Sequence, residues 1–291
     1  MTNPIKLADF PLLLQQIYNP PRQLYFRGNP NILKKTLIAI VGTRKFSDYG
    51  KHITKQIILD LSILDVAIVS GLAKGIDTIA HREAINNSLP TIAILGNGID
   101  EIYPRQNEAL AQEIIKQGGL ILSEHGPKTP PRAFHFPLRN RIISGLSIAT
   151  LVIECPIKSG ALITAKYALE QGREIFTVPG DIDLPNSQGP ITLLQNGAAY
   201  PVRNGREIIE IIQKQPHLFE SFQKTNNPLD HLRLSLGEKI LLSQLSPTRP
   251  RSLELLQKKT DLKAQEFLEA LSLLEIQNLV TMRDKKYLRN I

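Results

Sequence analysis

The chain has 291 residues, 42% of them hydrophobic, which is enough for one large packed domain and a smaller one and excludes a chain that is disordered throughout. Its 35 Lys and Arg residues against 27 Asp and Glu residues give a formal net charge of +8, a balance that favours polyanionic partners. The one cysteine, Cys155, excludes an internal disulfide bond. With no signal-like start and no apolar run long enough to span a bilayer, the sequence predicts a cytoplasmic protein with no membrane partner.

Residues 1–31 contain the Pro-rich and aromatic stretch YNPPRQLYFRGN, which predicts an ordered arm rather than a domain. In residues 32–214 a short β-branched run is followed repeatedly by a segment of helical spacing. The runs are LIAIVG, VAIVSG, TIAILGNG, GLILSE, ATLVIE and EIFTVPG. Helices are expected over residues 48–64, 76–86, 108–117 and 161–171. This alternation predicts an α/β fold, a Rossmann-like, doubly wound, mostly parallel sheet, in which ligands bind at the carboxyl ends of the strands.

Residues 215–235 are polar and punctuated by proline, which is typical of a linker. Residues 236–291 hold three helical patterns, LGEKILLSQL, SLELLQKKT and KAQEFLEALSLLEIQNL, followed by the short alternating tail VTMRDKKYLRN. Three helices and a small hairpin in about sixty residues predict a winged-helix domain.

The first candidate site is the turn that follows the strand LIAIVG, where Gly42, Thr43 and Arg44 precede a predicted helix. Backbone N–H groups at a helix N-terminus attract phosphate, the Thr43 hydroxyl is a donor, and an arginine can hold a phosphate with two hydrogen bonds. In the alternative, Gly42 only makes a tight turn and Arg44 is solvated.

The second candidate follows the next strand, where Gly71, Lys74 and Gly75 precede a helix. Glycines let a backbone approach a ligand closely, and Lys74 would add positive charge. The pattern is neither a dinucleotide fingerprint nor a Walker motif. Asp77 and His81 lie one helical turn apart and are expected to pair with each other, and no further residues complete a metal site around them.

Two further loops after strands carry polar residues. Asn97 lies between two glycines and is expected either to bind a sugar or phosphate or only to tolerate a left-handed turn. Lys158, Ser159, Gly160 and Thr164 surround another helix N-terminus that is suited to an anion.

The segment FHFPLRNRIISGLS, residues 134–147, places Phe136, Arg139, Asn140 and Arg141 beside an apolar run, and residues 125–153 contain no Asp or Glu. A solvated helix face usually mixes both signs of charge, so the segment is interpreted as one wall of a groove for phosphates and bases. The alternative is a structural one, in which the phenylalanines pack in the core and the arginines face solvent.

Taken together and in order, these motifs resemble those of the DNA processing protein A (DprA) family, also called Smf. The stretches that carry the resemblance are VGTR, SGLAKGIDTIAH, LGNGID with YP, SE, FPLRNRIISGLS, SGALITAKYALEQGR and VPG. They span the whole of the central predicted domain.

The resemblance implies a domain that binds single-stranded DNA, forms a homodimer and helps to load the RecA recombinase in natural transformation, with no cofactor, no metal and no catalytic step. Arg44, Arg139 and Arg141 match the phosphate-facing positions of the family. The chain differs from longer members in that its first thirty residues are too few for a separate N-terminal helical domain.

Two other functions are considered. The first is hydrolysis of a nucleotide N-glycosidic bond with Glu154, at the end of a strand, as nucleophile, although Glu154 could equally form a salt bridge with Arg139 or Arg141. The second is a nucleotide sensor that signals through the winged-helix domain.

Overall fold

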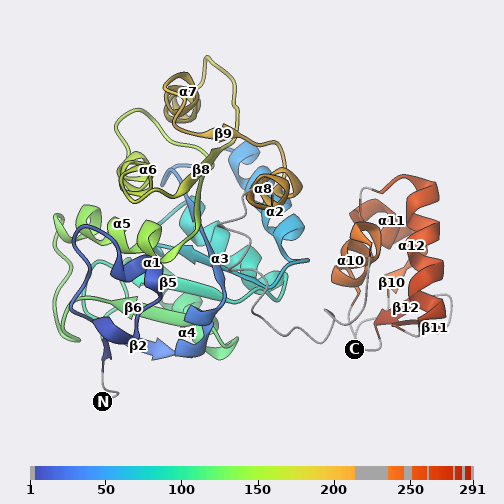
Figure 1. Cartoon of the computed structure of the whole chain (residues 1–291), viewed down its shortest axis with the longest axis horizontal. Coiled ribbons are helices and arrows are strands. Elements are labelled where there is room, and N and C mark those ends of the chain that lie inside the picture. Colours follow the sequence, from blue (N-terminus) through green and yellow to red (C-terminus); the bar gives the residue numbers. More distant parts are fainter. Residues whose placement is uncertain are drawn as a thin grey trace. The chain divides into compact units, whose positions relative to one another are not determined.

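The structure is a computed structural model of the chain. The residues it describes are 4–213, 235–245, 251–260, 262–277, 279–283 and 286–289. The chain divides into two compact units, Met1–Thr225 and Asn226–Ile291 (Figure 1). The division falls within the predicted linker, of which residues 215–234 lie outside the described residues.

The first unit is built on a nine-stranded sheet with the order β1-β2-β6-β5-β4-β3-β7-β8-β9. The parallel strands are β3 (Thr36–Val41), β4 (Val66–Ser70), β5 (Thr91–Leu95), β6 (Leu120–Ser123), β7 (Ala149–Val152), β8 (Glu174–Thr177) and β9 (Tyr200–Pro201). The chain winds outward from β3 to β6, returns to β7 beside β3, and continues to β9. This confirms the predicted doubly wound, mostly parallel sheet, with its switch point between β3 and β7.

The N-terminal arm is an integral part of this sheet. Strand β2 (Gln23–Gly28) pairs antiparallel with β6, and β1 (Ile5–Lys6) pairs antiparallel with β2. Three short helical turns, η1 (Leu7–Asp9), α1 (Leu12–Gln15) and η2 (Pro30–Lys34), complete the arm. The sequence predicts order here but not strands, because the six-residue strand β2 consists of mostly half-buried residues and lacks a continuous apolar run.

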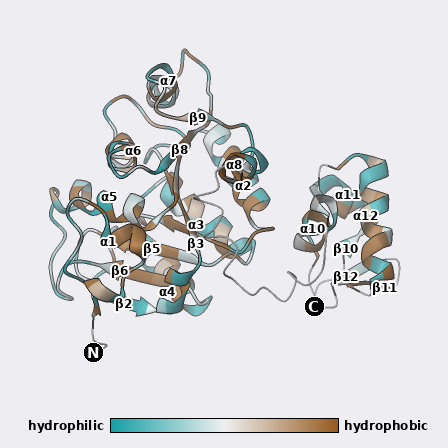
Figure 2. Ribbon diagram, viewed as in Figure 1, coloured by the Kyte–Doolittle hydropathy of each residue, from teal (hydrophilic) through white to brown (hydrophobic). Residues whose placement is uncertain are grey.

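Helices cover both faces of the sheet, because alternate residues of each strand point to opposite faces. From β3, Leu37 and Val41 pack in the same core cluster as residues of α1, α5 (His135–Leu146) and α6 (Gly160–Glu170). Ile38 and Ile40 pack on the other face with α2 (Asp48–Leu61), α3 (Ile76–Asn86) and α8 (Gly205–Gln213). Helix α4 (Glu108–Lys116) packs on β5 and β6. The short turn η3 (Arg105–Asn107) directly precedes α4, and the short turn η4 (Pro185–Ser187) directly precedes α7 (Gln188–Gln195). Figure 2 shows the central strands as hydrophobic.

Helix α5 begins at His135, within the segment FHFPLRNRIISGLS. It includes Pro137, which is tolerated there because first-turn N–H groups have no partner within the helix. This start places Phe136 and Arg139 on one helix with Asn140 and Arg141.

The second unit contains the three predicted helices and hairpin. The helices are α10 (Leu236–Ser243), α11 (Leu253–Thr260) and α12 (Ala264–Ile276), and the strands β10 (Arg251–Ser252), β11 (Val280–Arg283) and β12 (Lys286–Arg289) form a sheet in the order β10-β12-β11. Leu241, Leu256, Phe267 and Leu274 lie in its core. Among the described residues of the chain, no helix is both long and apolar enough to cross a membrane.

Candidate nucleic-acid interface

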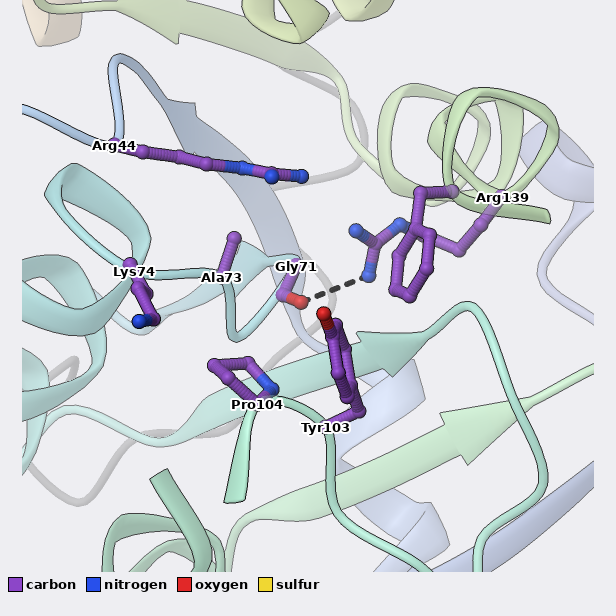
Figure 3. A pocket seen from close by; sticks show the side chains of 8 residues that line it. Arg44, Gly71, Ala73, Lys74, Tyr103, Pro104 and Arg139 are labelled. Carbon is purple, nitrogen blue, oxygen red and sulfur yellow. Dashed lines mark hydrogen bonds between the residues drawn. The ribbon is translucent and has the colours of Figure 1, made fainter. Parts of the chain in front are cut away.

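A pocket with an empty volume of about 350 Å³ lies where loops from the carboxyl ends of β3, β4 and β5 meet helix α5 (Figure 3). Its lining residues are Arg44, Gly71, Ala73, Lys74, Tyr103, Pro104, Phe136 and Arg139. Three cations therefore converge with two aromatic rings at the edge of the sheet where doubly wound folds bind ligands.

The turns after β3 and β4 are fastened to each other. The N–H of Ile76 donates to the carbonyl oxygen of Thr43 (3.1 Å), and Gly75, with φ of +86°, packs against Thr43 and Arg44. A residue with a Cβ at position 75 would be strained and would collide with the Thr43 carbonyl group. Thr43 is itself buried, so the backbone is fixed while the Arg44 side chain is exposed at the pocket.

Arg139 is the buried cation of the pocket, with 5% of its surface exposed. Its Nη1 group donates to the carbonyl oxygens of Gly71 (2.8 Å) and Ile94, and its Nε donates to Oδ1 of Asn140 (3.2 Å). Among the described residues, no acceptor occupies its Nη2 group. The guanidinium is thus held by protein acceptors on one side and retains donors for a ligand.

Asp77 faces Arg139 across Gly71. Its Oδ2 accepts the N–H groups of Gly71 (3.1 Å) and Ala73 (3.3 Å). A Cβ at position 71 would lie 2.7 Å from Arg139 Nη2 and 2.8 Å from Asp77 Oδ2, so only glycine fits between them. Burial raises the pKa of the Asp77 carboxyl group, and the nearby Arg139 cation opposes this rise.

The two arginines of the pocket repel each other. Figure 3 shows their guanidinium groups turned toward one another. Burial lowers the pKa of Arg139 to about 10, and Arg44 contributes to the lowering, whereas Asp77 opposes it. An anion between the two guanidinium groups would relieve this repulsion, so the geometry suits a phosphate.

An aromatic wall stands beside these cations. The rings of Tyr103 and Phe136 lie 5.4 Å apart at an interplanar angle of 43°, and Tyr103 is 45% exposed. The sequence predicts Phe136 at the site, but it does not predict Ala73, Tyr103 or Pro104. The Tyr-Pro pair, which follows the glycines around Asn97, is the available signal for Tyr103 and Pro104, whereas Ala73 lies between the two glycines after β4.

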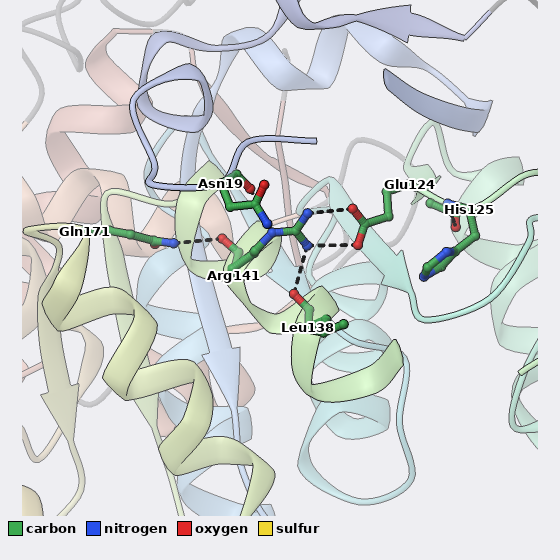
Figure 4. A network of polar contacts seen from close by, with 7 residues as sticks. Asn19, Glu124, His125, Leu138, Arg141 and Gln171 are labelled. Atoms are coloured by element: carbon green, nitrogen blue, oxygen red, sulfur yellow. Dashed lines mark hydrogen bonds and ion pairs between the residues drawn. The ribbon is translucent and has the colours of Figure 1, made fainter. Parts of the chain in front are cut away.

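Arg141 is not in the pocket, which corrects its expected place in the groove. Figure 4 shows its guanidinium paired with both oxygens of Glu124, at 2.8 and 2.6 Å. It also donates to the carbonyl oxygens of Asn19 (2.8 Å) and Leu138 (2.9 Å). These acceptors occupy Arg141 within the protein, where it ties α5 to the end of β6 and to the N-terminal arm.

Three other predicted site residues are buried in contacts within the protein. Asn97 donates to the carbonyl oxygens of Gly98 (3.0 Å) and Glu101 (2.6 Å) and is fully buried. Asn140 donates to the carbonyl oxygen of Gly160 (3.1 Å), and Thr164 donates within its own helix to the same oxygen (3.3 Å). These contacts hold the loop after β5 and the start of α6 in place, and all three residues lie outside the pocket lining.

The turn before α6 also lies outside the pocket lining. Lys158 and Gly160 are exposed there, and the Ser159 hydroxyl accepts the N–H of Ala161 (3.2 Å) as the N-cap of the helix. From the predicted site residues, the structure brings Arg44, Gly71, Lys74, Phe136 and Arg139 together in the pocket, while Gly42, Thr43 and Gly75 shape its turns.

Glu154 forms neither of the predicted salt bridges. Its carboxylate accepts the N–H of Ser47 (3.0 Å) and the Ser47 hydroxyl, and it is 4% exposed at the N-terminus of α2. A buried carboxylate in these bonds is not presented to a sugar, so the N-glycosidic hypothesis for Glu154 is not favoured.

Asp77 and His81 also do not pair with each other. The Nδ1 of His81 hydrogen-bonds to the Thr91 hydroxyl (2.7 Å), and burial together with the charge of Arg139 lowers the pKa of His81 to about 3. The described residues contain no group of three or more His, Cys, Asp or Glu that could hold a metal ion.

The chain matches the family model of DNA recombination-mediator protein A over residues 3–213. It belongs to this family. The match covers the first unit, which holds the pocket, and nearly three quarters of the chain.

Curated relatives agree with this assignment. The chain is 46% identical over 198 residues to DNA processing protein DprA of Bacillus subtilis, covering 68% of this chain and 66% of the relative. It is 44% identical over 193 residues to Protein Smf of Escherichia coli, covering 66% of this chain and 51% of the relative. The matched region thus spans between half and two thirds of the length of these relatives.

Solved structures of the family share the fold. The X-ray structure of DprA from Streptococcus pneumoniae has a TM-score of 0.68 at 41% identity, covering 72% of this chain and 73% of that chain. A DprA structure from Helicobacter pylori, described for its single-stranded DNA binding mode, has a TM-score of 0.66 at 32% identity. The match covers 73% of this chain and 95% of that chain.

We expect Arg141→Ala to lower the free energy of unfolding by about 3 kcal/mol, because it leaves the largely buried Glu124 carboxylate without its cation. Urea denaturation would measure this. The double variant Arg141→Leu with Glu124→Leu should recover much of the loss. An Arg141→Ala protein of wild-type stability would contradict the role of Arg141 in tying α5 to β6 and the arm.

We expect His81 to destabilise the first unit as the pH falls. The pKa of His81 is about 3 in the folded state and 6.5 in the unfolded state. Between these pH values His81 is protonated in the unfolded state and neutral in the folded state. The stability associated with the neutral, buried His81 is fully present above pH 6.5 and is lost progressively as the pH falls to 3. Thermal unfolding measured across this pH range should show that the melting temperature falls less steeply with falling pH for His81→Gln than for wild type. Equal slopes of melting temperature against pH would rule out the effect.

Proposed function

We propose that this chain binds single-stranded DNA in the pocket formed by Arg44, Lys74 and Arg139, and acts as a recombination mediator. The observation that carries the proposal is the buried Arg139, fixed by two backbone carbonyl groups with its Nη2 donors unoccupied by described residues, opposite an exposed Arg44. The H. pylori family member, whose description names single-stranded DNA binding, supports it.

The residues that line the pocket favour binding of single-stranded DNA of any sequence. Arginine and lysine neutralise backbone phosphates, which every sequence carries, whereas an aromatic ring stacks on any unpaired base. Phe136 and Tyr103 line the same pocket as the three cations, which supports this division of roles. A duplex offers no free base face to such rings, so it should bind more weakly.

The proposal includes no chemical step. Binding, protection and hand-over of a strand need only contacts that form and break, and Glu154, the candidate nucleophile, is occupied by Ser47. Incubation with deoxynucleotides followed by chromatography should give no free base. Base release that Glu154→Gln abolishes would overturn this part.

Loading of RecA, a homodimeric state and action in the cytoplasm are further parts of the same proposal, and the description of the family as a recombination mediator supports the first of them. In a strand-exchange assay, the protein should relieve the inhibition that single-strand-binding protein exerts on RecA. No relief at concentrations that saturate the DNA would count against the mediator role while leaving DNA binding intact.

We expect Arg44→Ala and Arg139→Ala each to weaken binding of oligo-dT at least tenfold, because each removes a proposed phosphate contact. Fluorescence anisotropy at several salt concentrations should also show the slope of log K against log salt reduced by about 0.7 for each lost contact.

The matched control for these variants is Lys116→Ala, which removes one exposed positive charge. Lys116 ends α4 just before the amino end of β6, whereas the pocket lies at the carboxyl ends of the strands. The control should bind like wild type. If Lys116→Ala weakens binding as much as Arg44→Ala, the attraction depends on net charge and the pocket is not the site.

A further inference from the structure

An exposed phenylalanine stands just outside the pocket. Phe134 is the N-cap residue of α5 and is 58% exposed, although it precedes the pocket residue Phe136 by only two positions. Residues two apart at a helix start point in different directions, so Phe136 turns into the pocket and Phe134 does not. A single exposed apolar side chain is ordinary at a protein surface, so the case for Phe134 depends on what supports and surrounds its ring.

The Phe134 ring is supported from beneath. It packs edge-on against His135, with ring centroids 4.4 Å apart and an interplanar angle of 72°. His135 is 7% exposed and stacks on His125 at 4.0 Å and 25°. Phe134 is therefore the outermost of three packed rings, and a partner that stacks on it would not have to immobilise a freely rotating side chain.

The surroundings of Phe134 are basic. Arg132 and Lys128 carry positive charge in the loop before it, and the carbonyl oxygen of Arg132 accepts the N–H of His135 (3.0 Å), which places Arg132 within one turn of Phe134. Glu124, the acid next to His125, is neutralised by Arg141. An exposed aromatic ring among cations is the combination by which proteins hold single strands.

The position continues the pocket along the edge of the sheet. Arg44 follows β3, Lys74 follows β4, Tyr103 follows β5, and His125, on which the ring stack rests, follows β6. The loops after β5 and β6 are joined by the bond from the Gly98 N–H to the Thr129 carbonyl oxygen (2.8 Å). The basic and aromatic groups thus follow the order of the strands, and the Phe134 stack lies one strand beyond Tyr103.

We propose that Phe134 is a second base-stacking platform, which holds a nucleotide of the same strand outside the pocket, with Arg132 on the adjoining phosphate. The proposal rests on the single-stranded DNA binding proposed above and adds a subsite to it. The pocket would hold one nucleotide, and the platform would extend the bound length toward β6.

The absence of tryptophan from the chain gives a direct test. Phe134→Trp introduces the one tryptophan of the protein, and stacking of a base on it should quench its fluorescence when oligo-dT is added. Leu169→Trp, 57% exposed near the C-terminal end of α6, is the control and should not respond. An unchanged Phe134→Trp emission while anisotropy of labelled oligo-dT reports full binding would overturn the proposal.

A second measurement separates the platform from the pocket. Phe134→Ala should weaken binding of a long oligo-dT about five- to tenfold, the loss of one base stack, and should leave binding of thymidine 5′-monophosphate, which occupies the pocket alone, at the wild-type level. Phe134→Tyr should bind both like wild type. If long oligo-dT binds Phe134→Ala as it binds wild type while Arg139→Ala weakens it, the platform fails and the pocket stands. If wild type binds no oligo-dT at all, the proposed function itself fails.

Discussion

An arginine that is 5% exposed has to find acceptors within the protein, and Arg139 finds them at the ends of two neighbouring strands of the sheet. Its bonds to the carbonyl oxygens of Gly71 and Ile94 join α5 to the ends of β4 and β5, and Asn140 carries the connection to the start of α6. Asp77 balances the charge from the far side of Gly71. The pocket therefore takes its shape from one buried cation.

The same bonds explain how a long stretch without acids is tolerated. Residues 125–153 carry no Asp or Glu, and the sequence alone suggests that Arg139 and Arg141 are free for a ligand. The structure supplies the missing charges from elsewhere in the chain, Glu124 for Arg141 and Asp77 for Arg139. The sequence shows which charged residues are neighbours along the chain, whereas the compensation of an arginine by a carboxylate depends on their distance in the folded structure.

The predictable part of the fold is the part with strong periodicity. Helix α3 has the predicted bounds Ile76–Asn86, and all six predicted apolar runs form strands of the large sheet. Strand β2 is not predicted, because its residues are only partly buried and are held by pairing with β6, about a hundred residues away in sequence. The candidate site is likewise predictable to the level of the loops but not of the side chains. Glycine turns after apolar strands correctly mark where Arg44, Gly71 and Lys74 meet, whereas the side-chain amides of Asn97 and Asn140 bind backbone carbonyl groups, which no local pattern reveals.

The carboxylate of Glu154 bears on why the pocket lies where it does. In a doubly wound sheet the crevice at the switch point, here between β3 and β7, is the usual seat of a phosphate at a helix N-terminus. In this chain the N-terminus of α2 already receives an anion from within the protein, since Glu154 at the end of β7 binds Ser47. A nucleotide phosphate at the switch point would meet the Glu154 carboxylate there, which disfavours it, and the pocket proposed for single-stranded DNA lies instead at the neighbouring ends of β3, β4 and β5.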